Sequence, residues 1–185
     1  MKRAGWAVIL VPLWLAAGAD RAGPYLEAGL GTATYEDDGR LASVDGAGEA
    51  QYRFIAGAFI NSYLSVELGF SHFNDFEGKT AEGERTREAF DCLSVGAVAH
   101  YPLFDDRIDL FAKFGAGQIF WNETGNGNRD SSAAALLYGA GVGVRATSRL
   151  TFNVGYDFHS FGMDDNTTRY DMNIGSVYFD VQVRF

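Results

Sequence analysis

The chain has 185 residues, long enough for one domain with its own core and too short for two large domains. Acidic residues outnumber basic ones by 24 to 15, for a formal net charge of −9, which argues against nucleic-acid binding because phosphate recognition needs an excess of Lys and Arg. The single cysteine, Cys92, excludes an internal disulfide, and no Cys or His cluster has the spacing of a metal site.

The N-terminus has the pattern of a secretory signal peptide. Lys2 and Arg3 precede the apolar run "AGWAVILVPLWLAA", and small residues follow at positions 17–19. A buried N-terminal helix is the alternative, but it would have to accommodate Pro12. We therefore predict a signal peptide over residues 1–19 and a single domain over residues 20–185.

Period-two alternation of apolar and polar residues recurs along the rest of the chain, in segments of about ten residues. The predicted strands cover residues 24–35, 50–60, 64–73, 89–101, 108–121, 133–146, 150–159 and 172–185.

The connections between these strands alternate in length. Connections two, four and six are short, whereas connections one, three, five and seven are long and polar. The long ones cover residues 36–49, 74–88, 122–132 and 160–171. This alternation places all short turns and both termini at one end, and it predicts an all-β fold: an eight-stranded antiparallel up-and-down transmembrane β-barrel.

Strand parity separates an apolar face from a polar face that is rich in glycine. The predicted polar network of the barrel lumen consists of Glu27, Arg53, Glu67, Lys113, Arg145, Asn153, Asp157, Asp180 and Arg184. A soluble secreted sandwich or lipocalin-like binder, with the apolar face inward, would show the same alternation. Mixed charges interspersed with glycine favour a narrow lumen instead.

Aromatic residues near the predicted strand ends also favour a membrane barrel, because they are typical of the girdles at membrane interfaces. We expect such girdles at Tyr63, Tyr101 and Phe104 on the short-turn side, and at Tyr35, Phe73, Phe120 and Trp121 on the long-loop side.

Four stretches carry a resemblance to a known family: "YLEAGLGTATYEDDG", "GAFINSYLSVELGF", "VGAVAHYPLFDDRIDLFAKFGAG" and "VYFDVQVRF". They resemble the OmpA-type transmembrane barrel family and, more loosely, the OmpX/Ail barrels. The resemblance implies a monomer in the outer membrane of a Gram-negative cell, with a role in envelope integrity or surface interaction. It also implies that the terminal aromatic, Phe185, is an assembly signal for the barrel assembly machinery.

The resemblance further implies a narrow, gated ion path, but not the open pore of a general diffusion porin. Glu67 matches the gating acid of the family, but the positions of its basic partners hold Val98 and Asn153. Lys113 and Arg145 are the alternative partners.

His159 has two alternative roles, one in catalysis and one as a structural contact in the lumen. His159 and Ser160 raise the possibility of a lipid A deacylase or acyltransferase barrel, but adjacent residues in a strand diverge, which favours His159 as a lumen contact. We therefore predict no catalytic residues, no metal and no cofactor. The loops are expected to meet lipopolysaccharide, or a protein or phage ligand. Their basic residues, which can reach lipid phosphates, are Arg40, Lys79, Arg85, Arg87, Arg129 and Arg169.

Overall fold

The computed structural model describes residues 22–45, 47–79, 83–124, 129–165 and 168–185, so the predicted signal peptide lies outside the described residues. Regular structure there consists of strands: β1 Gly23–Glu36, β2 Ser43–Asp45, β3 Ala47–Asn61, β4 Leu64–Lys79, β5 Arg85–Leu103, β6 Ile108–Thr124, β7 Arg129–Arg145, β8 Leu150–Asp165 and β9 Thr168–Arg184. In this part of the chain, no helix is long and apolar enough to cross a membrane.

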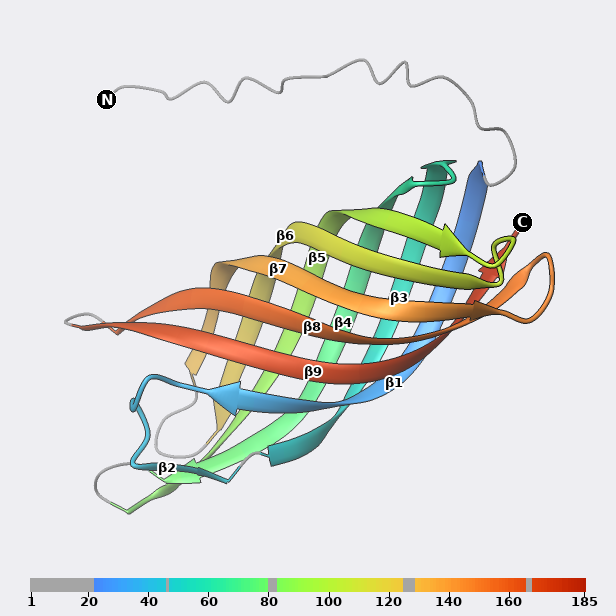
Figure 1. Cartoon of the computed structure of the whole chain (residues 1–185). Helices are drawn as coiled ribbons and strands as arrows, with labels where there is room; N and C mark the ends of the chain where they lie inside the picture. The colour runs from blue at the N-terminus through green and yellow to red at the C-terminus, as the bar shows by residue number, and fades with distance from the viewer. Residues whose placement is uncertain (1–21, 46, 80–82, 125–128, 166–167) are drawn as a thin grey trace, which may run out of the picture.

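Eight of the strands form a closed antiparallel barrel (Figure 1). Around this ring each strand pairs with the next one along the chain, with β1 pairing with β3, and the pairing of β4 with β5 is part of this series. The first and last strands also pair, with Tyr25 opposite Arg184, which closes the barrel. The short strand β2 lies outside this ring and pairs with the end of β4. The predicted fold class is confirmed. Closure also removes the free edge that β1 and β9 would otherwise expose.

The strands extend further toward the long-loop end than the sequence analysis predicted. β4 continues to Lys79 and β5 begins at Arg85, where the prediction had placed a loop over residues 74–88. The same correction applies to the hairpins β6–β7 and β8–β9. These polar segments pair as strands, and inward and outward side chains continue to alternate along them. Phe76 and Glu88, for example, are opposite each other in the β4–β5 pair, and both point inward and are buried. In Figure 1 the extensions lie at the lower left, away from the start of β1 and from the C-terminus.

The outer surface of the barrel is apolar. Leu30, Phe54, Val95 and Phe114 are each about 60% exposed, and their neighbours in sequence point inward. A soluble protein does not expose a continuous belt of this kind. The sandwich or lipocalin-like alternative, which required the apolar face to be inside, is therefore wrong.

The predicted girdle at the long-loop side is only partly correct. Phe120 is exposed, as are Tyr63, Tyr101 and Phe104 at the opposite end. Tyr35, Phe73 and Trp121 point inward instead and are buried. All three have the parity of inward residues on their own strands, so the error came from assigning them by their position at a strand end instead of by parity.

The interior of the barrel consists of two parts. The part toward the short turns contains the charged residues described below. The part toward the long hairpins contains a buried apolar cluster, which we call the upper cluster: Ala33, Tyr35, Phe73, Phe76, Phe90, Cys92, Ile119, Trp121, Ala135, Phe161, Met163, Met172 and Ile174. Most of these side chains come from strand segments that the prediction had treated as strand ends or loops.

Glycine makes room for large inward side chains in the lower part. A Cβ atom at Gly57 would overlap the ring of Tyr25, and one at Gly155 would lie 2.5 Å from Cζ of Tyr178. These two rings lie against the charged side chains, and each glycine is paired with its tyrosine on the adjacent strand, so the glycines allow the polar network to form in a narrow barrel.

Candidate functional site

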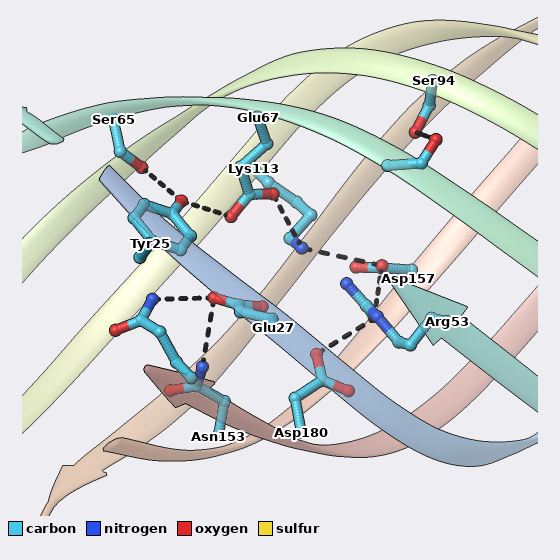
Figure 2. A network of polar contacts seen from close by, with 12 residues as sticks. Tyr25, Glu27, Arg53, Ser65, Glu67, Ser94, Lys113, Asn153, Asp157 and Asp180 are labelled. Carbon is cyan, nitrogen blue, oxygen red and sulfur yellow. Dashed lines mark hydrogen bonds and ion pairs between the residues drawn. The ribbon is translucent and has the colours of Figure 1, made fainter. Parts of the chain in front are cut away.

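Arg53 on β3 is the centre of the charged network in the lower part of the barrel (Figure 2). Its Nη1 donates to Oδ2 of Asp157 at 2.8 Å, and its Nε lies 3.1 Å from Oδ2 of Asp180. The guanidinium also lies over the ring of Tyr178, 3.6 Å from the centroid. All these groups are buried, so two carboxylates share one cation at a place that water does not reach.

Lys113 on β6 links this centre to Glu67 on β4. Its Nζ lies 3.4 Å from Oε2 of Glu67 and 3.8 Å from Oδ2 of Asp157. The hydroxyl of Tyr25 donates to the other oxygen of Glu67 at 2.7 Å. Of the two alternative partners considered for Glu67, the structure therefore places Lys113 beside it. Arg145 instead pairs with Asp106 at 3.5 Å, in the turn between β5 and β6.

Glu27 on β1 is held by amides rather than by a cation. Nε2 of Gln182 donates to it at 2.7 Å and Nδ2 of Asn153 at 3.4 Å. Arg184 donates to the carbonyl of Ser148 at 3.0 Å, at the short-turn rim. Of the nine predicted lumen residues, the structure gathers seven in the interior and places Arg145 and Arg184 at that rim.

The sequence analysis missed a second chain of polar contacts near the short turns. Oγ of Ser65 lies 2.9 Å from Nε2 of His100, and Nδ1 of His100 lies 2.9 Å from Oδ2 of Asp109. The order serine, histidine, aspartate is that of a hydrolase triad. All three residues have inward parity on the adjacent strands β4, β5 and β6, so combining parity with strand register would have found them.

The surroundings of Ser65 do not suit hydrolysis. Its side chain is fully buried, and the hydroxyl of Tyr25 lies 3.1 Å from its Oγ, where a substrate would have to approach. The ring of Phe59 packs against His100 at 4.8 Å. Backbone amides around Ser65 are engaged in the strand ladder, which leaves no evident donors for an oxyanion. We interpret this chain as a hydrogen-bonded connection to Glu67 through Tyr25.

His159 and Ser160 do not form a nucleophile–base pair. His159 is buried and meets the ring of Phe73 edge-on at 5.4 Å, at the boundary between the polar network and the upper cluster. Ser160 follows it on the opposite face of β8.

At the long-hairpin end, Arg40 folds into the mouth of the barrel. Its guanidinium pairs with buried Glu88 and, at 3.3 Å, with Glu123, and it lies 5.2 Å from the ring centroid of Trp121. The carboxylate of Asp37 accepts the backbone N–H of Leu41 at 2.7 Å, which fixes the turn before β2. Arg40 is thus a structural cation rather than an exposed one.

Other basic residues surround a polar pocket at the same end, with a volume of about 400 Å³. The cations in its wall are Lys79, Arg85 and Arg87, and hydroxyls come from Ser43 and Thr124. All three cations are exposed, and Arg87 pairs with Glu77 at 2.9 Å. Within the described residues, no group of His, Cys, Asp or Glu could hold a metal ion.

Comparison with known proteins gives a family and a set of similar folds. The family model described as outer membrane protein beta-barrel domain matches residues 7–185. The structure of Neisserial surface protein A (NspA) is 18% identical, covers 88% of this chain and 97% of its own, and superposes with a TM-score of 0.65. Ail of Yersinia pestis is 16% identical, with coverages of 89% and 99% and a TM-score of 0.58. OprG of Pseudomonas aeruginosa is 11% identical, with coverages of 89% and 97% and a TM-score of 0.61. No curated protein matches the chain.

Proposed function

Since this chain belongs to the family of outer membrane β-barrel proteins, we propose that it is a surface protein whose extracellular end binds phosphate- or sulfate-bearing ligands. In such barrels the short turns face the periplasm and the long hairpins face the outside. The site is therefore the pocket formed by Lys79, Arg85 and Arg87, which we call the basic pocket.

The observation that carries this proposal is the pocket itself. It lies outside the barrel wall, where β2 pairs with the end of β4, and it combines three exposed cations, of which Arg87 pairs with Glu77, with hydroxyl groups. Its volume of about 400 Å³ is within the range of small-ligand sites, roughly 300–1,000 Å³. Anionic oxygens are the acceptors that Lys and Arg bind most strongly. The fold relative Ail has been crystallised with the heparin analogue sucrose octasulfate, which supports testing the same class of ligand here.

The interior supports a role at the surface rather than transport. The upper cluster fills the barrel above the charged network, and the cavity that Arg53, Glu67 and Lys113 line has a volume of only about 20 Å³. The gated ion path, with Glu67 and Lys113 as the switching pair, would have to cross this cluster. We expect planar-bilayer recordings to give no channel events, and events altered by Glu67→Ala would revive the ion path.

We also propose that the protein is not an enzyme. One fold relative, OmpT of Escherichia coli, is an outer membrane protease with 10% identity and a TM-score of 0.55, so the fold alone does not decide the question. The burial of Ser65 and the divergence of His159 and Ser160 argue against a hydrolase. Incubation with lipid A should give no deacylated or acylated product, whereas a product lost in Ser65→Ala or His159→Ala would overturn this view.

The binding proposal is tested with sucrose octasulfate and with lipopolysaccharide. Replacing Lys79 and Arg85 by Ala should weaken binding of both and flatten its dependence on salt, because two charge contacts are lost. Arg149→Ala is the matched control, since Arg149 is exposed at the periplasmic end. Equal affinities of the double variant and the control variant would contradict the proposal.

A further inference from the structure

The segment that joins β1 to β2 has a defined shape. We call its residues 37–42 the strap; in Figure 1 it lies at the lower left, beside the label of β2. The carboxylate of Asp37 accepts the backbone N–H of Gly39 at 3.2 Å and that of Leu41 at 2.7 Å. Gly39 has a φ of 78°, a left-handed conformation that glycine adopts without steric cost. This turn leaves the side chains of Arg40 and Leu41 to attach the strap to the barrel.

Arg40 attaches the strap to two carboxylates in the mouth of the barrel. Its guanidinium pairs with Glu88 on β5 and, at 3.3 Å, with Oε2 of Glu123 on β6. The side chain of Glu88 is fully buried, and that of Arg40 is only 10% exposed. A buried carboxylate needs a cationic partner, because removing the partner leaves an uncompensated charge away from water. The pairing therefore holds the strap against the barrel.

Leu41 and Ala42 attach the strap at a second place, on β4. The side chain of Leu41 is buried against Gly78, and a Cβ atom at Gly78 would lie 2.5 Å from Cδ1 of Leu41. Glycine at this position thus makes room for the leucine. The backbone N–H of Ala42 donates to the carbonyl of Lys79 at 2.9 Å. The strap therefore contacts β4 at a residue that also supplies a cation to the basic pocket.

Both attachments lead to the wall of the basic pocket. Ser43, the residue after the strap, lines the pocket together with Lys79. Thr86 lines it as well, and its hydroxyl donates to Oε1 of Glu123 at 3.1 Å. Glu123 therefore binds the pocket wall with one oxygen and Arg40 with the other. The position of the strap and the composition of the pocket wall depend on the same contacts.

The charge of Arg40 also affects an anion in the pocket. Glu88 and Glu123 place two carboxylates behind Thr86, and Arg40 offsets one of their two negative charges. Glu123 is only 14% exposed, and salt screens such partly buried charges less than exposed ones. Without Arg40, both carboxylates would repel a phosphate or sulfate group bound at the other side of the wall.

We propose that the strap regulates the basic pocket, with Arg40 as the positioning residue. The inference rests on the function proposed above for this pocket. With Arg40 between Glu88 and Glu123, the strap holds Ser43 in the pocket wall and reduces the negative charge behind it. A phosphate- or sulfate-bearing ligand binds most tightly to the pocket with the strap attached. By linkage, the bound ligand must favour the attached strap to the same extent.

The unaltered protein in phospholipid vesicles gives the first test. Hydrogen exchange of the backbone amides in residues 37–42 is measured with and without saturating sucrose octasulfate. These six residues are not among the described residues that line the pocket, so a ligand in the pocket reaches them only through the strap. We expect the ligand to slow their exchange about fivefold or more, and to leave the periplasmic turn at residues 104–107 unchanged. Equal exchange of the strap with and without the ligand would overturn the proposal.

Two variants test the strap in binding. Arg40→Gln removes the cation, whereas Leu41→Ala removes an apolar contact without changing the charge. Each should weaken binding of sucrose octasulfate about fivefold or more, and in Arg40→Gln saturating ligand should no longer slow exchange of the strap. Arg149→Gln is the matched control, because it removes the same charge from an exposed residue at the periplasmic end. Heat-modifiable gel migration establishes that all three variants are folded.

The results separate this inference from the proposed function. If replacement of Lys79 and Arg85 by Ala leaves binding of sucrose octasulfate as tight as in the control, the pocket is not the site and both proposals fail. If that double variant binds weakly while Arg40→Gln binds like the control, the pocket remains the site and only the role of the strap is overturned. An unchanged affinity of Leu41→Ala would also overturn it, since charge alone would then explain the effect of Arg40.

Discussion

The lower and upper parts of the barrel interior are made by the same strands but are stabilised differently. On β8, Asn153 and Asp157 belong to the charged network, whereas Phe161 and Met163, on the same face, belong to the upper cluster. Strand parity therefore fixes which side chains point inward, while position along the strand decides whether the interior is charged or apolar.

The location of each part explains this difference. The charged network lies at the level of the lipid-facing belt, where outward side chains such as Phe54 and Val154 are apolar. Polar side chains there can face only the lumen, where they neutralise one another. The upper cluster lies toward the long hairpins, where outward side chains such as Glu77 and Arg87 are charged. Those hairpins pack their inward apolar side chains together, as a water-soluble protein does.

Removing the central cation should have the largest effect. Arg53→Met leaves Asp157 and Asp180 buried without their shared partner, and we expect the free energy of unfolding to fall by about 3–5 kcal/mol. Urea unfolding of the protein in phospholipid vesicles measures it. Arg85→Met is the control, because Arg85 is exposed. A loss as small as that of the control would show that the network does not stabilise the lower part.

Truncating the upper cluster should cost somewhat less. Phe90 packs against Tyr35 with ring centroids 4.9 Å apart and against Phe161 at 5.9 Å. Phe90→Ala leaves a cavity, and we expect a loss of about 3 kcal/mol, together with faster proteolysis of the long hairpins. Phe120→Ala, on the exposed face of β6, is the control, and an equal effect would argue against a packed upper part.

Removing one hydroxyl of the Ser65 chain should have a smaller effect. Ser65→Ala takes a hydrogen-bond partner from both His100 and Tyr25, and the expected loss is about 1–2 kcal/mol in the same unfolding measurement. Ser94→Ala, which removes only one long contact of 3.5 Å to the carbonyl of Gly69, should change stability less. If the two serine variants were equal, the chain would not couple the short-turn end to Glu67.

Parity and connection length were sufficient to predict the barrel, the direction of its faces and seven of the lumen residues. They failed where information from two strands had to be combined. The contact between Glu67 and Lys113, and the one between Ser65 and His100, depend on register, which a single strand does not specify. Glu67 therefore had two alternative partners at that stage.

The upper cluster was missed for a different reason. The hairpin β4–β5 carries many polar outward residues, such as Glu77 and Arg87, so it was taken for a loop. Phe76, Phe90 and Trp121 nevertheless keep the inward parity of the strands below. The fold of Arg40 into the mouth could not be predicted, since it depends on Glu88 and Glu123 from two other strands.

Deletion of Phe185 tests whether a residue that lies outside both parts of the interior affects assembly of the barrel and not its stability. It is 72% exposed at the periplasmic end, and only its backbone N–H makes a described hydrogen bond, to the carbonyl of Pro24 at 3.2 Å. Deleting it should therefore change the free energy of unfolding by no more than about 0.5 kcal/mol. If the terminal aromatic is the signal read by the assembly machinery, the deletion should nonetheless lower the amount of folded protein in the outer membrane, measured by heat-modifiable migration. Phe104→Ala is the matched control, because Phe104 is an aromatic of equal exposure at the same end. Equal assembly of the two variants would remove the role of Phe185 as a signal, since aromatic exposure at that rim is common to both.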